Sequence, residues 1–180
     1  MIIRLPRPLL RLPTVHPSRL LAPVLLTGTL ALAAAAPAHA QSRTPVFELG
    51  AGVSLTRDND TTPVVAADWL PRWREFAGGQ LHWETGLLHV RGRGGSRLDN
   101  DHDVTLLHGG LRYERPSGLV GGFGIGVQAG ETEALSGGPQ FISTLGWRWG
   151  RFSLLARHVS NASLHQPNDG ETLLQGAWRF

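Results

Sequence analysis

The chain has 180 residues and a formal net charge of +3, and it contains neither lysine nor cysteine. The absence of cysteine excludes a small fold held together by disulfides. Four of the 17 arginines lie within the first 19 residues, and without them 13 cations face 14 acids. The remaining chain therefore has a formal charge of −1, which does not favour nucleic acid as a partner.

Residues 1–40 are predicted to be a cleaved signal peptide. A basic segment without acids precedes the apolar run Leu20–Ala36, and the tripeptide 38–40 (Ala-His-Ala) fits a small-x-small cleavage site. The apolar run is short for a membrane anchor and is followed by a polar segment. Cleavage leaves one exported domain, 41–180, and closing a β-barrel is one way for such a domain to be stable without disulfides.

After the leader, apolar and polar residues alternate with a period of two, which predicts β-strands with one apolar face. In the first strand, odd-numbered positions from Phe47 to Leu55 are apolar and even-numbered positions are polar or small. The fourth strand is the least regular, because Leu106 and Leu107 are both apolar. In chain order, strands are expected near residues 47–55, 65–69, 81–87, 104–113, 119–129, 140–149, 152–158 and 172–180.

Eight strands separated by alternately long and short polar breaks predict an all-β fold, an eight-stranded antiparallel transmembrane β-barrel of the outer membrane. The polar faces would line the lumen, and five tryptophans near strand ends or on apolar faces would form girdles at the membrane surfaces. The final Phe180, with Trp178 two residues before it, fits this interpretation. A soluble lipocalin-like barrel or sandwich is the alternative, since alternation alone does not distinguish water from lipid. A lumen network is expected from Glu48, Asp68, His82, Glu84 and Arg148.

His158 and Ser160 stand two residues apart at the end of the seventh predicted strand, on its apolar face. Polar groups that face lipid cost desolvation free energy unless they are paired or used. A serine nucleophile needs a neighbouring base, and that base needs an orienting group. On the outer wall of a barrel, this pair would meet an ester in a lipid. The alternative is a chance His-x-Ser followed by an ordinary turn rich in Asn, Pro and Gly.

Residues 157–171, RHVSNASLHQPNDGE, resemble the lipid A 3-O-deacylase (PagL) family of outer-membrane barrels, which carry a His-x-Ser-Asn-Ala motif and a Pro-Asn turn before an acid. The resemblance implies a serine esterase without metal or cofactor. Ser160 would be the nucleophile, His158 the general base and Glu171 the acid that orients it. The substrate would be lipopolysaccharide, from whose lipid A the enzyme removes the 3-O-linked 3-hydroxyacyl chain.

The resemblance also implies that Asn168 contributes to an oxyanion hole, with Asn161 as a weaker candidate. The chain departs from the family pattern at the acid, which the family places one residue further from the motif. By strict alternation Glu171 faces the lumen and Thr172 faces lipid, so a bulge or a shorter turn would be needed to bring Glu171 to the site. Asp169 is the reserve acid.

Two other functions remain open for such a chain. A non-enzymatic small barrel, an adhesin or a structural protein, would have the same architecture. An outer-membrane phospholipase would use the same groups on glycerophospholipids, but those enzymes have larger barrels and use calcium. Whether two barrels pair into a homodimer in the membrane also stays open.

Overall fold

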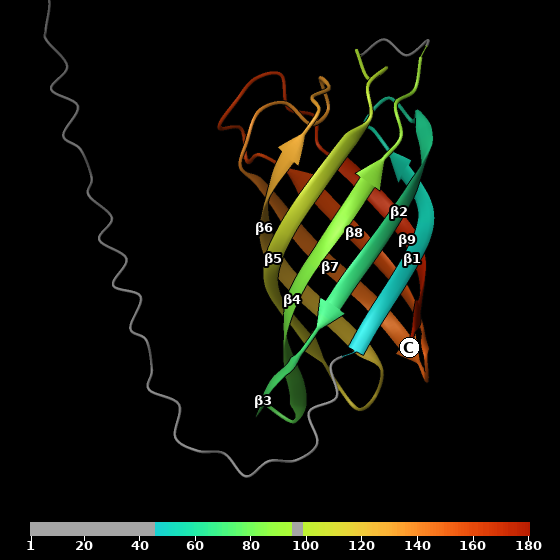
Figure 1. Cartoon of the computed structure of the whole chain (residues 1–180), viewed down its shortest axis with the longest axis vertical. Helices are drawn as coiled ribbons and strands as arrows, with labels where there is room; N and C mark the ends of the chain where they lie inside the picture. The colour runs from blue at the N-terminus through green and yellow to red at the C-terminus, as the bar shows by residue number, and fades with distance from the viewer. Residues whose placement is uncertain (1–45, 95–98) are drawn as a thin grey trace, which may run out of the picture. The chain divides into compact units, whose positions relative to one another are not determined.

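In the computed structural model, which describes residues 46–94 and 99–180, the chain forms one antiparallel sheet closed into a barrel (Figure 1). The strands are β1 (Val46–Leu55), β2 (Thr61–Leu70), β3 (Arg72–Phe76), β4 (Gly79–Val90), β5 (Val104–Glu114), β6 (Leu119–Ala129), β7 (Gln140–Trp149), β8 (Phe152–Ser160) and β9 (Glu171–Arg179). No helix long and apolar enough to cross a membrane occurs within these described ranges.

The barrel is eight-stranded, as predicted, because β2 and β3 together occupy the place of one strand in the wall. β1 pairs with β2 and β9, the strands from β3 to β9 pair in succession, and the ring closes through β2 and β4. β3 follows β2 after Pro71 and pairs with the start of β4, so it lengthens one position of the wall. The sequence pattern predicts no strand between those at 65–69 and 81–87, and this prediction is wrong for Arg72–Phe76. This strand escaped prediction because it extends beyond the apolar band and has no buried face.

The two ends of the barrel differ. The described parts of the long connections, 91–94, 99–103, 130–139 and 161–170, gather at one end, whereas short turns and both ends of the barrel's chain lie at the other (Figure 1). Small outer-membrane barrels have long extracellular loops and short periplasmic turns. We refer to the two ends as the loop end and the turn end.

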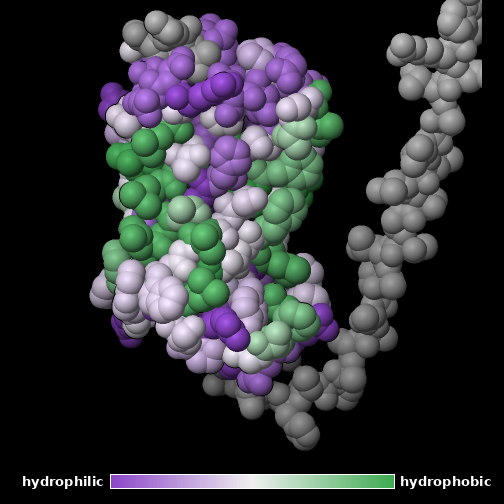
Figure 2. All heavy atoms as spheres, turned by 180° about the vertical axis from the view of Figure 1, so that it is seen from behind, coloured by the Kyte–Doolittle hydropathy of each residue, from purple (hydrophilic) through white to green (hydrophobic). Residues whose placement is uncertain are grey.

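The outer surface of the wall is apolar. Figure 2 shows a broad hydrophobic zone between a hydrophilic loop end and a mixed turn end. All five tryptophans that were assigned to girdles face outward, with exposed fractions from 39% to 55%. They are Trp69, Trp83, Trp147, Trp149 and Trp178. A barrel that exposes large apolar side chains around its wall and buries charges inside is typical of a membrane-spanning barrel.

The interior is divided into two zones. Toward the turn end it holds charged side chains, and toward the loop end it holds a cluster of buried aliphatic residues that includes Leu135 from the β6–β7 loop. This cluster explains the irregular fourth predicted strand. Leu106 points inward and is fully buried, whereas Leu107 points outward and is 53% exposed. β5 keeps its alternation, and both of its faces are apolar at this height.

Candidate active site

β8 and β9 place His158 and Ser160 on the outer face of the wall at the loop end. The side chains of β8 alternate strictly between exposed and buried up to Ser160, which is half-buried. This is the consequence of period-two geometry, since residues 158 and 160 share a side with the apolar Ala156. The pair therefore lies at the edge of the apolar band, as predicted from the sequence.

The His158 ring is held from β9. The register pairs His158 with Ser143 on β7 and with Thr172 on β9. Its Nδ1 atom lies 3.1 Å from the Thr172 hydroxyl oxygen, a hydrogen-bonding distance. The other ring nitrogen, Nε2, has no hydrogen-bond partner among the described residues, and the ring makes no hydrogen bond with Ser160.

Gly170 brings the two side chains toward one point. Its φ angle is +67°, a conformation that favours glycine. A β-carbon at this position would lie 3.0 Å from Cε1 of His158 and 3.1 Å from Cβ of Ser160. The imidazole ring and Cβ of Ser160 therefore both lie next to Gly170, where a larger residue would crowd them.

The structure does not bring Glu171 to this site. The β8–β9 pairing is continuous and pairs Glu171 with Val159, so both point inward. The Glu171 carboxylate is buried, accepts a hydrogen bond from the Ser54 hydroxyl and forms an ion pair of 2.7 Å with Arg93. The prediction that Glu171 orients His158 is therefore corrected: the bulge it required is absent from the described β8–β9 pair.

Asn161 braces two loops. Its side chain is fully buried, and its Nδ2 donates to the carbonyl oxygens of Ser136 (2.6 Å) and His165 (3.2 Å). The backbone N–H of Gly170 donates to the Ala134 carbonyl at 3.0 Å and ties the turn to the same loop. The side chain of Asn161 is thus occupied with structure.

Asn168 and Asp169 lie on the turn that faces the site. The side-chain oxygen of Asn168 accepts a hydrogen bond of 3.3 Å from the backbone N–H of Asn161, which leaves the amide NH₂ group as a donor. Asp169 is exposed, and within the described ranges its carboxylate has no hydrogen bond or ion pair. Of the two predicted asparagines, Asn168 is the one whose amide NH₂ group has no partner among the described residues.

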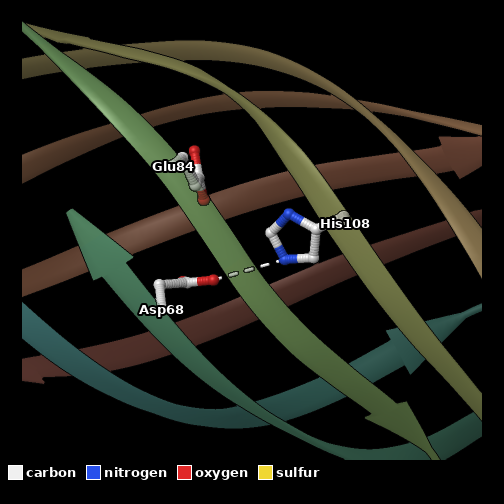
Figure 3. A group of neighbouring side chains, drawn as sticks. All are labelled: Asp68, Glu84 and His108. Carbon is white, nitrogen blue, oxygen red and sulfur yellow. Dashed lines mark ion pairs between the residues drawn. The ribbon is translucent and has the colours of Figure 1, made fainter. Parts of the chain in front are cut away.

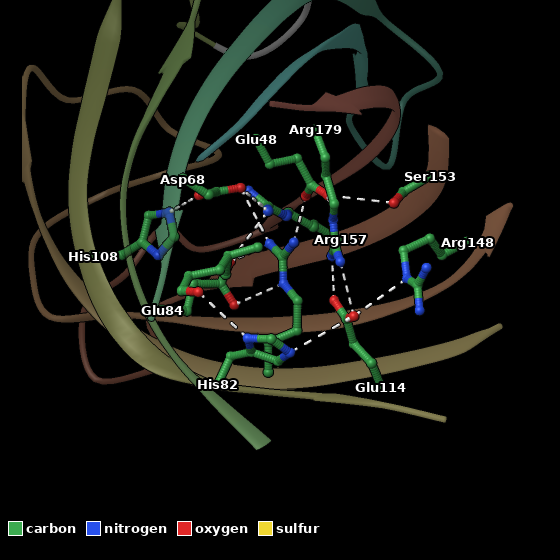
Figure 4. A network of polar contacts seen from close by, with 12 residues as sticks. Glu48, Asp68, His82, Glu84, His108, Glu114, Arg148, Ser153, Arg157 and Arg179 are labelled. Carbon is green, nitrogen blue, oxygen red and sulfur yellow. Dashed lines mark hydrogen bonds and ion pairs between the residues drawn. The ribbon is translucent and has the colours of Figure 1, made fainter. Parts of the chain in front are cut away.

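The lumen holds the predicted charged network, and it is larger than predicted (Figure 4). Arg112 is fully buried and forms ion pairs with Glu48, Asp68 and Glu84. The sequence pattern had also missed the partners Glu114, His108, Arg157 and Arg179. Alternation places all of them inward, but it does not predict which strands face each other across the lumen.

Among the residues that the structure describes, two clusters have metal-ligand chemistry. Asp68, Glu84 and His108 bring one ligand atom each within 4.8 Å of one another inside the barrel (Figure 3). Arg112 and Arg157 form ion pairs with both carboxylates, so these residues do not fit a cation. The other cluster, Asp99, Asp101 and His102, is exposed on the β4–β5 loop.

The sequence matches no known family, and no curated protein matches it. Among solved structures, the crystal structure of the outer membrane enzyme PagL is 19% identical, covers 74% of this chain and 98% of its own, and has a TM-score of 0.49. Ail, the attachment invasion locus protein of Yersinia pestis, is 12% identical, covers 78% and 100%, and has a TM-score of 0.43. At these values neither similarity assigns an activity.

Proposed function

We propose that this chain is an outer-membrane esterase that uses Ser160 and His158 to remove the 3-O-linked 3-hydroxyacyl chain of lipid A. The observation that carries the proposal is the convergence of His158 and Ser160 on Gly170, on the outer face of the wall. This position is reached from the lipid phase, because the lumen behind it is filled by buried side chains. A lipid ester at the level of the long loops is the substrate class that fits it.

The reaction follows from the two side chains. Ser160 Oγ attacks the ester carbonyl carbon while Nε2 of His158 takes its proton. The carbonyl oxygen becomes an oxyanion, for which the Asn168 amide is the candidate donor. Collapse breaks the ester bond, and His158 returns the proton to the departing sugar oxygen. Water, deprotonated by His158, then releases the fatty acid and restores Ser160.

A non-enzymatic barrel is the second candidate, and a specific observation favours it. The group that contacts His158 Nδ1 is a hydroxyl, whereas Ser-His hydrolases commonly place a carboxylate there. A binding or structural barrel with the same wall would not need a carboxylate beside His158, so a hydroxyl in that position would cost it no function.

Mass spectrometry of lipid A from cells that produce the wild type or Ser160→Ala distinguishes these functions. We expect loss of one 3-hydroxyacyl chain with the wild type, and a reduction on the order of 10³-fold or more with Ser160→Ala, because the nucleophile is gone. Heat-modified migration in gels checks that both barrels are folded. Unchanged lipid A with both folded proteins would support the non-enzymatic barrel. Release of fatty acid from glycerophospholipids alone would indicate a phospholipase.

A further inference from the structure

We propose that Thr172 is the positioning residue of His158, and that this chain uses a neutral hydroxyl where a Ser-His-acid site uses a carboxylate. This inference rests on the proposed function and assigns a role that neither Glu171 nor Asp169 fills in the structure. Four observations carry it: the register, the contact at Nδ1, the burial of the nearest acid in β9, and a second His-Thr pair without a serine.

The first two observations concern position. Thr172 is the residue of β9 that stands opposite His158, and its hydroxyl oxygen lies 3.1 Å from Nδ1. Threonine is branched at Cβ and restricted at χ1, so a hydroxyl on this strand is held in place at low entropic cost. When the oxygen of Thr172 accepts from Nδ1–H, the lone pair of the imidazole is on Nε2. That is the tautomer a general base beside Ser160 requires.

The third observation explains why the partner is neutral. The acid at the start of β9 points inward, where Ser54 and Arg93 stabilise it. An unpaired carboxylate on the outer face would be costly to desolvate against lipid, whereas a hydroxyl costs far less. The residues paired with His158 are Ser143 and Thr172, both neutral, and the charged or titratable side chains of the adjoining turn are those of Asp169 and His165.

A neutral partner fixes the orientation of the imidazole without stabilising its positive charge. The imidazolium that forms during attack thus lacks the electrostatic support a carboxylate provides. We infer an enzyme whose histidine is correctly oriented but whose maximal rate is lower than a carboxylate partner would allow.

The fourth observation supplies a matched control. His89 on β4 is paired with Thr105 on β5, and its Nδ1 lies 2.9 Å from the threonine hydroxyl. In the candidate site, Ser160 follows His158 by two residues. The residue at the same distance after His89, just beyond the end of β4, is Arg91. Here the Nε2 atom faces Asp103 at 3.6 Å. Because the His89–Thr105 pair has no serine beside it, removing its hydroxyl measures what a His-Thr hydrogen bond contributes to the stability of the barrel.

The test compares Thr172→Val, Thr172→Ser, Thr172→Glu and Thr105→Val in detergent micelles with purified lipid A, over a range of pH. We expect Thr172→Val to lower the maximal rate by about tenfold or more, because the ring loses its tautomer and orientation. Thr172→Ser should restore most of the rate, and Thr105→Val should leave it unchanged. Thr172→Glu should raise the maximal rate and move the acidic limb of the pH profile to higher pH.

A folded Thr172→Val barrel with the rate and pH profile of the wild type would overturn the role of Thr172 and leave the esterase standing. If wild type and Thr172→Glu are both inactive, the proposed function fails. ¹⁵N NMR of the His158 ring then decides the positioning role separately. The wild type should show Nδ1–H, and Thr172→Val should lose this preference; identical spectra would contradict the inference.

Discussion

At the scale of single residues, Gly170 combines a left-handed backbone with close contact to both reacting side chains. Gly170→Ala should therefore lower stability by about 1 kcal/mol through backbone strain and, in addition, displace His158 and Ser160. We expect hydrolysis to fall by about tenfold or more, since small misplacements of reacting groups are costly. Thermal unfolding and initial rates of lipid A hydrolysis measure the two effects.

Gly150 is the matched control for this substitution. Its φ of +60° is nearly the same, but a β-carbon there would meet no atom within 4 Å, and it lies in the turn between β7 and β8 at the other end of the barrel. Gly150→Ala should show a similar loss of stability with full activity. Equal activity of the two variants would argue against crowding of the site at Gly170.

At the scale of the β8–β9 hairpin, a shift of one residue decides which side of the wall a side chain occupies. Glu171 and Thr172 are neighbours in sequence, yet the first faces the lumen and the second faces lipid. Glu171→Gln should keep lipid A hydrolysis within about threefold of the wild type, because its carboxylate does not contact His158. Asp169→Asn, on the exposed turn, should behave in the same way.

Folded Glu171→Gln could instead lose as much hydrolysis as Ser160→Ala. That result would mean that the β8–β9 hairpin changes its register during catalysis. Thermal unfolding of Glu171→Gln provides the internal check. Arg93 would lose its charged partner at the loop end, so a lower melting temperature with full activity is the combination that the structure predicts.

The alternation of apolar and polar residues determines how much of the fold and of the candidate site could be predicted from the sequence. Period-two patterning is a local property, so it identified eight strands and the outward side of His158 and Ser160. It also placed Glu171 inside and Thr172 outside, which the resemblance to a family with an acid near this position obscured. The contact between His158 and Thr172 depends on the register between two strands, which no single strand encodes. β3 and the inward Leu106 escaped because they do not follow a simple apolar-out, polar-in rule.

At the scale of the whole molecule, Arg112 joins acids from three strands in the centre of the lumen. Arg112→Met would leave Glu48, Asp68 and Glu84 buried with less compensation. Removing one partner of a buried charged network costs roughly 3–5 kcal/mol. Urea unfolding in detergent or lipid vesicles should show a loss of this order. Arg115→Met, at an exposed arginine in the turn between β5 and β6, is the control and should change the free energy of unfolding little.

The placement of His158 and Ser160 on the outside of the wall determines how the reaction would respond to concentration. A lipid reaches an outward-facing site by lateral diffusion within its own leaflet, and both products stay in or beside that leaflet. The rate should then follow the mole fraction of substrate in the surface and be insensitive to its amount per volume of water. Adding inert detergent at constant lipid A would slow the enzyme by surface dilution, as expected for an enzyme that works in two dimensions.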